Sequence, residues 1–373
     1  MRIAIVAESF LPQVNGVSNT VRHVVERATA SGHDVLVVAP GPGPDHHAGA
    51  PVVRTRSLRL PGYRSFPMGL PDVAVHRSLE RFAPDVVHLA SPVALGAVGL
   101  RSARQLGVPT VGVYQTDVAG FARHYGLAPA EAAVDRWVAA LHQRMQRTLA
   151  PSSASQRRLE GLGVDEVHLW RRGVSLDLFG PERRREALRR SWGADGRTVV
   201  GYVGRLAAEK QVRRLVELAD LPGVHLVVVG DGPERDGLEA ALPRATFTGM
   251  LRGAELAAAF ASLDVFVHTG EHETFCQTVQ EAQASGVAVV VPAAGGPLDL
   301  VSHGRSGLFH TPDERTSFAT TVAAVARDPL LRRRLALGGR RAVAARTWER
   351  VVDELLDEHY PAVTGQRVAR PAA

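Results

Sequence analysis

Cysteine is almost absent from this sequence of 373 residues, in which Cys276 stands alone. No internal disulfide can form, and such a composition is typical of a reducing compartment. Long apolar runs are also missing: the longest have only strand length, and the first residues bring a charge at Arg2 and a break at Pro12. We therefore expect neither a membrane span nor a signal peptide, and a cytoplasmic location.

Two signatures of bound groups are missing as well. The chain has no D-x-D motif and no His, Cys and Asp cluster with ligand spacing, so we expect no metal and no other cofactor. His268 lies in an apolar strand and His272 in the loop beside it, and we interpret both as structural or substrate-contacting residues. Neither half contains G-x-G-x-x-G, so a dinucleotide site of the dehydrogenase type lacks its fingerprint.

The chain has enough apolar material for two cores. Hydrophobic residues make up 45% and charged residues 22%, which excludes a disordered or fibrous protein. A length of 373 residues suits two α/β domains rather than one. The formal net charge of +6 is compatible with nucleic acid, an anionic membrane face or a phosphorylated ligand, and it does not choose among them.

The same order of elements occurs twice along the chain. Short apolar strands alternate with helical segments, which predicts doubly wound parallel sheets covered by helices on both faces. The expected strands of the first half are 2–8, 33–40, 84–92 and 108–117, and those of the second half are 197–206, 224–232, 264–270 and 286–292. Helices are expected at 17–32 and 209–221. The charged, glycine-punctuated stretch near 175–195 is the expected interdomain boundary.

The loops after the strands are the expected place for chemistry, because ligands of open parallel sheets lie beyond the carboxyl ends of the strands. Gly16 stands between the first strand and its helix, where free N–H groups and the helix dipole favour an anion. A plain turn that needs a glycine is an equal alternative. Arg205 and Lys210, in "GRLAAEK", are suited to neutralise a diphosphate, although a solvated helix start would look similar.

Two carboxylates, Glu273 and Glu281, stand with seven residues between them in "EHETFCQTVQEAQ". If a helix begins near Phe275, they are roughly 9–12 Å apart along its axis, too far for an acid/base pair on one glycosidic bond. They fit an extended ligand such as a sugar nucleotide better, with Glu273 on the sugar hydroxyls and Glu281 on the ribose. The N–H groups of Phe275 and Cys276 then meet the oxygens between. An exposed helix carboxylate is the simpler alternative for Glu281 alone.

These motifs resemble a known family. "GRLAAEK", "GDGPERDGLE" and the long stretch from "FTGMLRG" through "GEHETFCQTVQEAQASG" to "HGRSGLF" are similar to the C-terminal half of the retaining glycosyltransferases of family four. "ESFLPQVNGVSNTV", "PDVVHLASPVALG" and "GVYQTDVAGFARHYGL" resemble in particular the bacterial α-mannosyltransferases that use GDP-mannose and often act on lipid acceptors. The resemblance runs nearly from end to end.

The resemblance implies a GT-B fold, in which two Rossmann-like parallel-sheet domains face a cleft. It places an acceptor-side domain at 1–180 and a nucleotide-sugar-binding domain at 190–345. The amphipathic segment at about 348–365 is then a helix that crosses back to the first domain, with Trp348 at the crossover.

The resemblance also implies roles for single residues. Arg205 and Lys210 hold the donor diphosphate with the amide of Gly16, while Glu273 contacts the transferred sugar and Glu281 the ribose. The turn at 295–296 resembles a loop that shapes the donor pocket, and a tight strand-to-helix connection explains it equally simply. We count Arg205, Lys210 and Glu273 among the catalytic residues.

One departure from the family lies in "YQTD". Many relatives have a histidine in this loop, where this chain has Gln115 followed by Asp117. We assign both to the sugar and acceptor side, with Asp117 among the catalytic residues. No activated nucleophile stands out, so the resemblance favours front-face attack by the acceptor hydroxyl, without a metal.

The acceptor is expected to be a lipid or glycolipid. Tyr63 and Arg64 belong to "RTRSLRLPGYRSFPMGLP", which interleaves arginines with apolar residues and suits an anionic membrane surface, although an exposed strand and loop would look the same. The run "RRREALRR" at 183–190 we interpret as a solvated helix face.

The expected partners are therefore a nucleotide-sugar donor and a lipid acceptor, with peripheral membrane contact and no nucleic acid. A UDP-sugar transferase with a soluble acceptor, a sugar-nucleotide epimerase and a non-catalytic nucleotide-sugar-binding protein stay open as alternatives.

Overall fold

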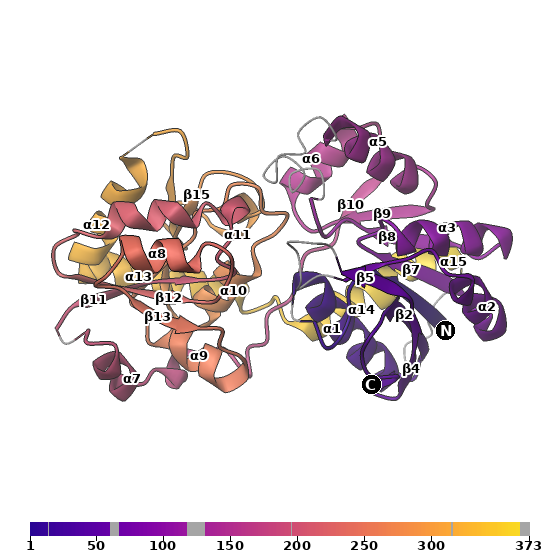
Figure 1. Cartoon of the computed structure of the whole chain (residues 1–373), viewed down its shortest axis with the longest axis horizontal. Coiled ribbons are helices and arrows are strands. Elements are labelled where there is room, and N and C mark those ends of the chain that lie inside the picture. Colours follow the sequence, from indigo (N-terminus) through magenta and orange to yellow (C-terminus); the bar gives the residue numbers. More distant parts are fainter. Residues whose placement is uncertain (14, 60–66, 118–130, 195, 315, 366–373) are drawn as a thin grey trace. The chain divides into compact units, whose positions relative to one another are not determined.

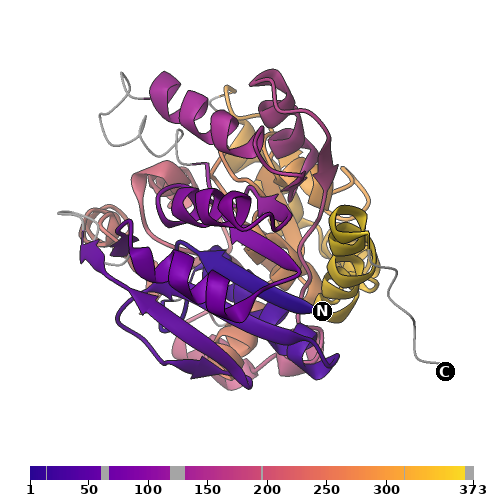
Figure 2. The same ribbon diagram turned by 90° about the vertical axis from the view of Figure 1, so that its right-hand side faces the viewer.

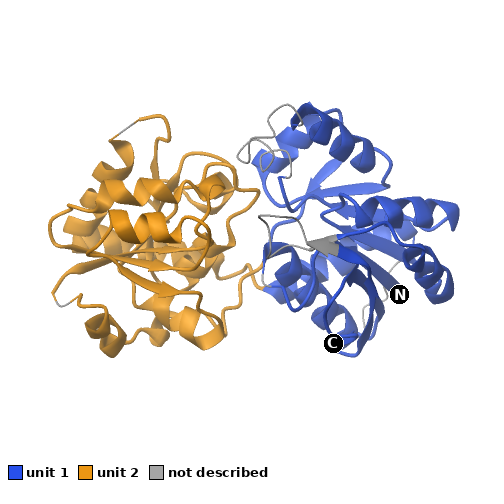
Figure 3. Ribbon diagram, in the orientation of Figure 1, with its two compact units in different colours: residues 1–123, 127–172, 348–373 blue, residues 124–126, 173–347 orange. Residues whose placement is uncertain are grey.

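The computed structural model describes residues 1–13, 15–59, 67–117, 131–194, 196–314 and 316–365. These residues form two compact units, which Figure 3 shows in different colours. Unit 1 contains the described residues up to Arg172 and those from Trp348 onward, and unit 2 contains Gly173–Thr347. The chain thus leaves unit 1 at Arg172, shortly before the expected stretch 175–195. The C-terminal segment returns to unit 1, as the resemblance implies.

Unit 1 is built on an eight-stranded sheet in the order β10-β9-β8-β7-β1-β2-β4-β3. All neighbours are parallel except β3 and β4. The strands are β1 (Arg2–Ala7), β2 (Asp34–Pro40), β3 (His46–His47), β4 (Ala50–Thr55), β7 (Val86–Ala90), β8 (Thr110–Val113), β9 (Arg147–Ala150) and β10 (Val167–Leu169), and a separate hairpin pairs β5 (Ser57–Arg59) with β6 (Pro67–Gly69). The central strands are fully buried, because valine, isoleucine and alanine face helices on both sides.

The helices of unit 1 include a C-terminal group that lies far from the others in sequence. They are α1 (Gly16–Ala30), α2 (Val73–Phe82), α3 (Leu95–Gln105), α5 (Glu131–His142), α6 (Ser153–Gly161), α14 (Trp348–Glu354), the π-helical turn η5 (Leu355–His359) and α15 (Tyr360–Thr364). Figure 2 shows the C-terminal helices in yellow. Val352, Leu355 and Tyr360 from this group are fully buried in the same core as β1 and α1.

Unit 2 has a six-stranded, fully parallel sheet in the order β13-β12-β11-β14-β15-β16 (Figure 1). Its strands are β11 (Thr198–Val203), β12 (Val224–Val229), β13 (Thr246–Gly249), β14 (Val265–Val267), β15 (Ala288–Pro292) and β16 (Leu308–His310). Its helices are η2 (Pro181–Arg183), α7 (Glu186–Ser191), η3 (Ala208–Lys210), η4 (Val212–Leu218), α8 (Arg235–Ala241), α9 (Gly253–Ala261), α10 (Gln277–Ala284), α11 (Pro297–Leu300), α12 (Ser317–Arg327) and α13 (Pro329–Val343). Core clusters lie on the two faces of this sheet.

The expected strands are present in both sheets, and one expected helix differs. The segment 209–221 is predicted as one helix, but it forms two 3₁₀ pieces, η3 and η4. Gln211 between them has a φ of +50°, in the left-handed region, which interrupts a continuous α-helix. The buried Val212, Leu215 and Leu218 then recur every three residues, the period of a 3₁₀-helix.

Candidate active site

The sheet of unit 2 reverses its strand order between β11 and β14. From β11 the chain proceeds through β12 to β13 on one side, and from β14 through β15 to β16 on the other. The chain therefore leaves the neighbouring strands β11 and β14 in opposite directions. The point between their carboxyl ends is a topological switch point, where ligands of open α/β sheets bind. The loop after β11 carries Arg205 and Lys210, and the loop after β14 carries Glu273. Both predicted loops thus meet at the edge where a ligand is expected.

Glycines fix the loop that carries Arg205. Gly230 has a φ of +139°, and a Cβ there would lie 1.9 Å from the carbonyl oxygen of Gly204. A Cβ at Gly232 would lie 2.2 Å from the carbonyl oxygen of Leu206. The Leu206 amide donates to Asp231 across the same contact, at 2.9 Å. The loops after β11 and β12 are therefore in backbone contact that side chains at these glycines would prevent.

The two predicted cations of this loop have carboxylate partners. Arg205 pairs with the buried Glu209. Lys210 donates from Nζ to Oε1 of Glu273, at 2.6 Å. Burial by itself lowers the pKa of Lys210, but the Glu273 carboxylate more than offsets this and raises it. Lys210 is therefore a fixed ammonium in direct contact with the predicted sugar-binding carboxylate.

Glu273 lies between two cationic groups. His268 Nε2 is 3.0 Å from the same Oε1 atom that Lys210 binds. Burial alone would raise the pKa of Glu273, but Lys210 and then His268 hold it well below its usual range. Burial likewise lowers the pKa of His268, and the neighbouring Cys276 and Glu273 raise it to about 10. Glu273 is therefore an ionised carboxylate that Lys210 and His268 hold between them.

His268 is a site residue that sequence reasoning left undecided between a structural and a substrate-contacting role. Its ring is buried and stacks on Tyr202, with ring centroids 6.1 Å apart and planes 12° from parallel. The side chains of His268, Glu273 and Cys276 offer ligand atoms within 4.8 Å of one another. Because Lys210 already binds Oε1 of Glu273 and His268 is held as a cation, this trio does not fit a metal ion.

The helix after Glu273 begins later than the sequence predicts. The expected start near Phe275 is wrong by two residues: α10 begins at Gln277, and Cys276 precedes it with a φ of +79°. Phe275 and Cys276 are both buried in the core of unit 2. Gln277 donates from its side chain to the carbonyl of Gly173, at 2.8 Å, and this contact accompanies the delayed start. Contacts of the Phe275 and Cys276 amides with a donor stay a prediction.

The glycine pair 295–296 supports the loop that carries Glu273. The Gly296 amide donates to the carbonyl of Glu273, at 2.7 Å. A Cβ at Gly296 would lie 2.5 Å from the Cα of Phe275, and one at Gly295 would lie 2.6 Å from the carbonyl oxygen of Glu271. This turn therefore both connects β15 to α11 and packs directly on the backbone around Glu273, so the two explanations given by the sequence are compatible.

Glu281 lies in the second turn of α10 and is half-buried. Its side chain forms no ion pair or hydrogen bond with the rest of the described chain. Burial raises its pKa from 4.5 to about 7. A carboxylate in this state gains from a ligand hydroxyl that donates to it, because such a bond restores part of the solvation that burial removed.

Unit 1 has its own switch point, between β1 and β7. The loop after β1 ends at Gly16, the first residue of α1, and Asn15 caps that helix by accepting from the Ser18 amide at 2.9 Å. After β7, α3 begins where the buried Glu8 accepts from the Gly96 amide, at 2.9 Å. Gly16 thus occupies the helix N-terminus at which the sequence predicts an anion contact.

Arg172 joins two predicted residues of unit 1, and sequence reasoning missed it. This buried guanidinium donates to Oε1 of Gln115, at 3.2 Å. A Cβ at Gly16 would lie 2.7 Å from its Nη1 atom. Gln115 and Gly16 are therefore brought together through Arg172. The only signal in the sequence was the pair of arginines in "WRRG", which lay next to the stretch taken as the domain boundary.

The other acceptor-side predictions have mixed outcomes. Asp117 accepts from the Tyr114 hydroxyl at 3.3 Å and lies 3.5 Å from Arg158, which also binds Asp135. These contacts of Asp117 belong to a half-buried polar network, and its catalytic role stays a prediction. The predicted acceptor residues Tyr63 and Arg64 lie outside the described residues.

Comparison with known proteins places these features in a family. The model of Glycosyltransferase Family 4 matches residues 14–178, and that of Glycosyl transferases group 1 matches residues 184–342. A GDP-mannose-dependent alpha-mannosyltransferase of Mycolicibacterium smegmatis is 52% identical over 100% of both chains. This chain belongs to glycosyltransferase family 4. The recognition, the fold and the enzyme class predicted from the sequence are confirmed.

More distant relatives match nearly the whole length of this glycosyltransferase. A protein of Mycobacterium tuberculosis named GDP-mannose-dependent alpha-(1-6)-phosphatidylinositol dimannoside mannosyltransferase is 28% identical over 95% of both chains. The structure of sucrose-phosphate synthase from Thermosynechococcus elongatus superposes with a TM-score of 0.82 at 20% identity, covering 98% of this chain and 100% of the other. That likeness concerns the fold.

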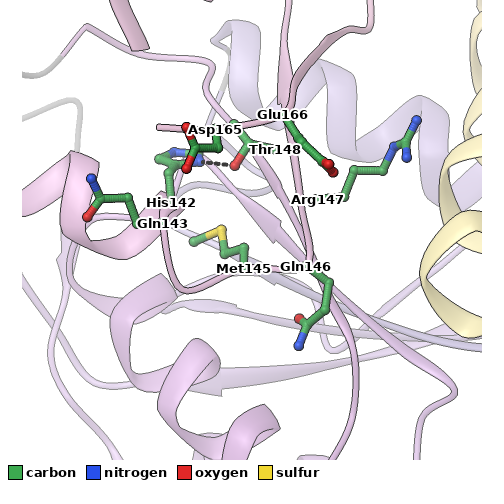
Figure 4. A pocket seen from close by; sticks show the side chains of 8 residues that line it. All are labelled: His142, Gln143, Met145, Gln146, Arg147, Thr148, Asp165 and Glu166. Carbon is green, nitrogen blue, oxygen red and sulfur yellow. Dashed lines mark hydrogen bonds between the residues drawn. The ribbon is translucent and has the colours of Figure 1, made fainter. Parts of the chain in front are cut away.

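A cavity of the glycosyltransferase lies away from the predicted site residues (Figure 4). Its volume is about 160 Å³, and its walls include His142, Thr148 and Glu166 of unit 1. It lies where β9 begins, whereas Gln115 follows the end of the parallel neighbour β8. The cavity is therefore at the amino ends of the strands, whereas the predicted site is at their carboxyl ends. One ring nitrogen of His142 is hydrogen-bonded to the Thr148 hydroxyl, at 3.1 Å.

Proposed function

We propose that this glycosyltransferase moves mannose from GDP-mannose, with retention of anomeric configuration, to a hydroxyl of a lipid or glycolipid acceptor. The observation that carries the choice of donor is the 52% identity over the full length with a protein named for that donor and sugar. The cluster of Lys210, Glu273 and His268 at the switch point of unit 2 supports the donor-binding role of that unit.

Arg205 and Lys210 supply charge for the donor diphosphate. The half-exposed Arg205 guanidinium presents several N–H donors in one plane, which suits two phosphate oxygens at once. Lys210 adds a fixed ammonium beside the leaving diphosphate. Such preorganised cations stabilise the negative charge that develops as the glycosidic bond breaks.

Glu273 serves as a fixed acceptor for sugar hydroxyls rather than as a nucleophile. Its Oε1 atom is held by Lys210 and His268, and these bonds make the carboxylate a weak base and a weak nucleophile. We therefore favour direct attack of the acceptor hydroxyl on the anomeric carbon from the side of the leaving group. The bond from that carbon to the diphosphate oxygen breaks, and the acceptor proton passes to the departing phosphate. Glu281 binds the ribose.

The lipid nature of the acceptor rests on chemistry and on relatives. The M. tuberculosis relative is named for a phosphatidylinositol dimannoside, an anionic glycolipid. The net charge of +6 favours an anionic surface. Within the described part of the chain, no helix is long and apolar enough to cross a membrane. We propose peripheral contact with the membrane that holds the acceptor.

A thermal-shift panel without added metal tests the donor first. GDP, UDP, ADP, GDP-mannose and UDP-glucose are compared, because a ligand that binds the folded state raises the melting temperature by mass action. Stabilisation by GDP and GDP-mannose above the others is the expected result. A preference for UDP compounds would move the donor to a UDP sugar, and no response to any nucleotide would contradict the assignment of the site.

Product analysis tests the reaction itself. With GDP-mannose and a membrane lipid extract, we expect mannosylated lipid, with the rate unchanged by EDTA and lost in Lys210→Ala. Conversion of the donor into another sugar nucleotide without acceptor would indicate an epimerase. Rapid transfer to soluble acceptors with none to lipid would contradict the lipid acceptor.

A further inference from the structure

Helix α13 in unit 2 carries arginines but no acidic residue. Its sequence "PLLRRRLALGGRRAV" contains five arginines and neither aspartate nor glutamate. One side of the helix is buried through Leu335, Gly339 and Val343. A Cβ at Gly338 would lie 1.9 Å from the carbonyl oxygen of Arg305, so the glycines let α13 pack closely on its own unit. The orientation of the helix is therefore fixed by its buried side.

The opposite side of α13 combines charge with exposed apolar residues. Leu330 is 80% exposed and Leu337 is 49% exposed. The exposed arginines follow the same helical spacing of three, four and seven residues, and together with the two leucines they define the α13 face: Leu330, Arg333, Arg334, Leu337, Arg340 and Arg341. A helix face that combines positively charged arginines with exposed leucines is typical of helices that lie in a membrane interface.

The arginines of the α13 face have no acidic partners among the described residues. The remaining arginine of the helix, Arg332, turns back to the carbonyls of Val325 and Ala326 at the end of α12, so it is used within the fold. Arg333, Arg334, Arg340 and Arg341 form no ion pair or hydrogen bond within the part of the chain that the structure describes. Their charges are available to an external anionic surface.

The two arginine-rich stretches that stand out in the sequence are used differently. In the run at 183–190, Arg184 and Arg189 both pair with Glu186 and Asp264. In the stretch that begins at Arg54, within β4, the Arg54 guanidinium donates to the carbonyls of Leu11, Pro40 and Pro44. The number of arginines in a stretch therefore does not predict which of them lack acidic partners. The ion pairs and hydrogen bonds of the structure identify those arginines.

We propose that the α13 face docks this glycosyltransferase on an anionic lipid surface. An anionic lipid is the expected ligand because the proposed function has a lipid acceptor. The four arginines without acidic partners and the two exposed leucines are the features that suit it. The guanidinium groups bind lipid phosphates, and the leucines enter the boundary between headgroups and acyl chains. Nucleic acid would use the charges but not Leu330 and Leu337.

Flotation with vesicles tests the proposal on the full chain. Vesicles of phosphatidylcholine alone are compared with vesicles that also contain phosphatidylglycerol. We expect binding to the anionic vesicles only, weakened by salt, and reduced roughly tenfold or more in Arg334→Glu/Arg341→Glu, because each basic residue near an anionic surface strengthens binding several-fold. Leu330→Ser/Leu337→Ser is expected to reduce the binding that persists at high salt.

A variant with the same change of net charge serves as the matched control. Arg77→Glu/Arg81→Glu alters two exposed arginines of α2 in unit 1, which form no ion pair among the described residues. This control is expected to keep at least half of the vesicle binding. Equal losses in both double variants, or unchanged binding in the α13 variant, would overturn the proposal.

The same preparations separate this proposal from the proposed function. The α13 variants are expected to keep the thermal shift with GDP and the rate with detergent-solubilised acceptor, and to lose activity on vesicle-borne acceptor. Vesicle binding that needs the α13 face but comes without mannosyl transfer would support the docking surface and contradict the proposed reaction. If the α13 variants transfer mannose to vesicle-borne lipid as fast as the unchanged chain, the result would support the proposed reaction and contradict the docking surface.

Discussion

Arg172 shows how one side chain links residues that the sequence could only treat separately. Its guanidinium contacts Gln115, and it reaches the first residue of α1. A buried cation beside a helix N-terminus adds its charge to that of the helix dipole. At the scale of single residues, Gln115 therefore has a buried cation as its partner, which the motifs in the sequence do not reveal.

Gly16→Ala tests this arrangement. A Cβ at position 16 would lie 2.7 Å from Arg172 Nη1, the end of a flexible side chain, so Arg172 is expected to move while the fold is kept. Because alanine is a better helix residue than glycine, the free energy of unfolding should change by no more than about 1 kcal/mol. We expect kcat/KM for mannosyl transfer to fall about tenfold, a loss of about 1.4 kcal/mol in transition-state binding.

The matched control for Gly16→Ala is Gly161→Ala, at the end of α6, where a Cβ meets nothing within 4 Å. It is expected to leave both stability and kcat/KM unchanged. If Gly16→Ala also keeps full kcat/KM, the contact between Gly16 and Arg172 has no part in catalysis.

Glu281 predicts a dependence of stability on pH. Its pKa rises from 4.5 in the unfolded chain to about 7 in the folded one, so folding takes up a proton between these values. The cost of the buried carboxylate is present above about pH 7 and absent below about pH 4.5. Glu281→Gln should therefore stabilise the ligand-free protein at about pH 8, by about 2 kcal/mol for this half-buried group, and have no such effect near pH 4.5.

Melting temperatures of the two proteins at both pH values measure this effect. Exposed Glu255 on α9 provides the control, since Glu255→Gln should be neutral throughout. Because a ribose hydroxyl donates to the ionised carboxylate, GDP affinity of the unchanged chain should rise from about pH 6 to pH 8, and that of Glu281→Gln should stay flat and weaker. Stabilisation of the variant equally at all pH values would contradict the assignment.

At the scale of elements, the loops that carry the site depend on close backbone contacts with neighbouring loops. The turn at 295–296 packs against the backbone from Glu271 to Phe275, and the turn after β12 packs against the one after β11. Predicted strands and the glycine-rich turns follow from apolar runs and from glycine itself, and both are present. The two-residue delay of α10 does not follow, because Cys276 takes a left-handed conformation that no local pattern signals.

Gly296→Ala tests the support of Glu273 by its neighbouring turn. Gly296 has an ordinary helical φ of −60°, so the change adds no backbone strain, but the new Cβ would lie 2.5 Å from the Cα of Phe275. We expect a loss of about 1–3 kcal/mol in the free energy of unfolding and a larger fall in kcat than in nucleotide affinity, since Glu273 is displaced.

Urea unfolding and steady-state kinetics measure these two effects. Gly237→Ala in α8, where a Cβ meets nothing within 4 Å, is expected to be neutral or slightly stabilising. A fully active Gly296→Ala enzyme would show that the turn has no role in placing Glu273.

At the scale of the whole molecule, the two-unit architecture is predictable because each half repeats the alternation of strand and helix. The resemblance to the family also predicts that the C-terminal segment packs on unit 1, as it does in the structure. The sequence does not show which buried groups of the C-terminal helices contact which groups of unit 1. Trp170 donates from its indole to the carbonyl of Val351, at 2.8 Å, and His88 meets the hydroxyl of Tyr360, at 2.9 Å. These partners are 181 and 272 residues apart, so no local pattern can pair them.

Truncation after Thr347 should therefore unfold unit 1 selectively. It exposes the core that Val352, Leu355 and Tyr360 cover, and it leaves the buried His88 and Trp170 without their partners. Each orphaned polar group costs about 1–3 kcal/mol, in addition to the exposed apolar surface. Unit 2 contains residues 173–347 and loses none of its own chain.

Calorimetry with hydrogen exchange distinguishes the two units. In the chain that ends at Thr347, protection should be lost in β1, β7 and α1 while it persists in β11 and β15. A chain that ends at Gly365 is the control and should match the full-length protein, because the described C-terminal helices are then complete. Unchanged protection of β1 and β7 after the first truncation would mean that unit 1 folds without the returning helices, and that their burial against it adds little to stability.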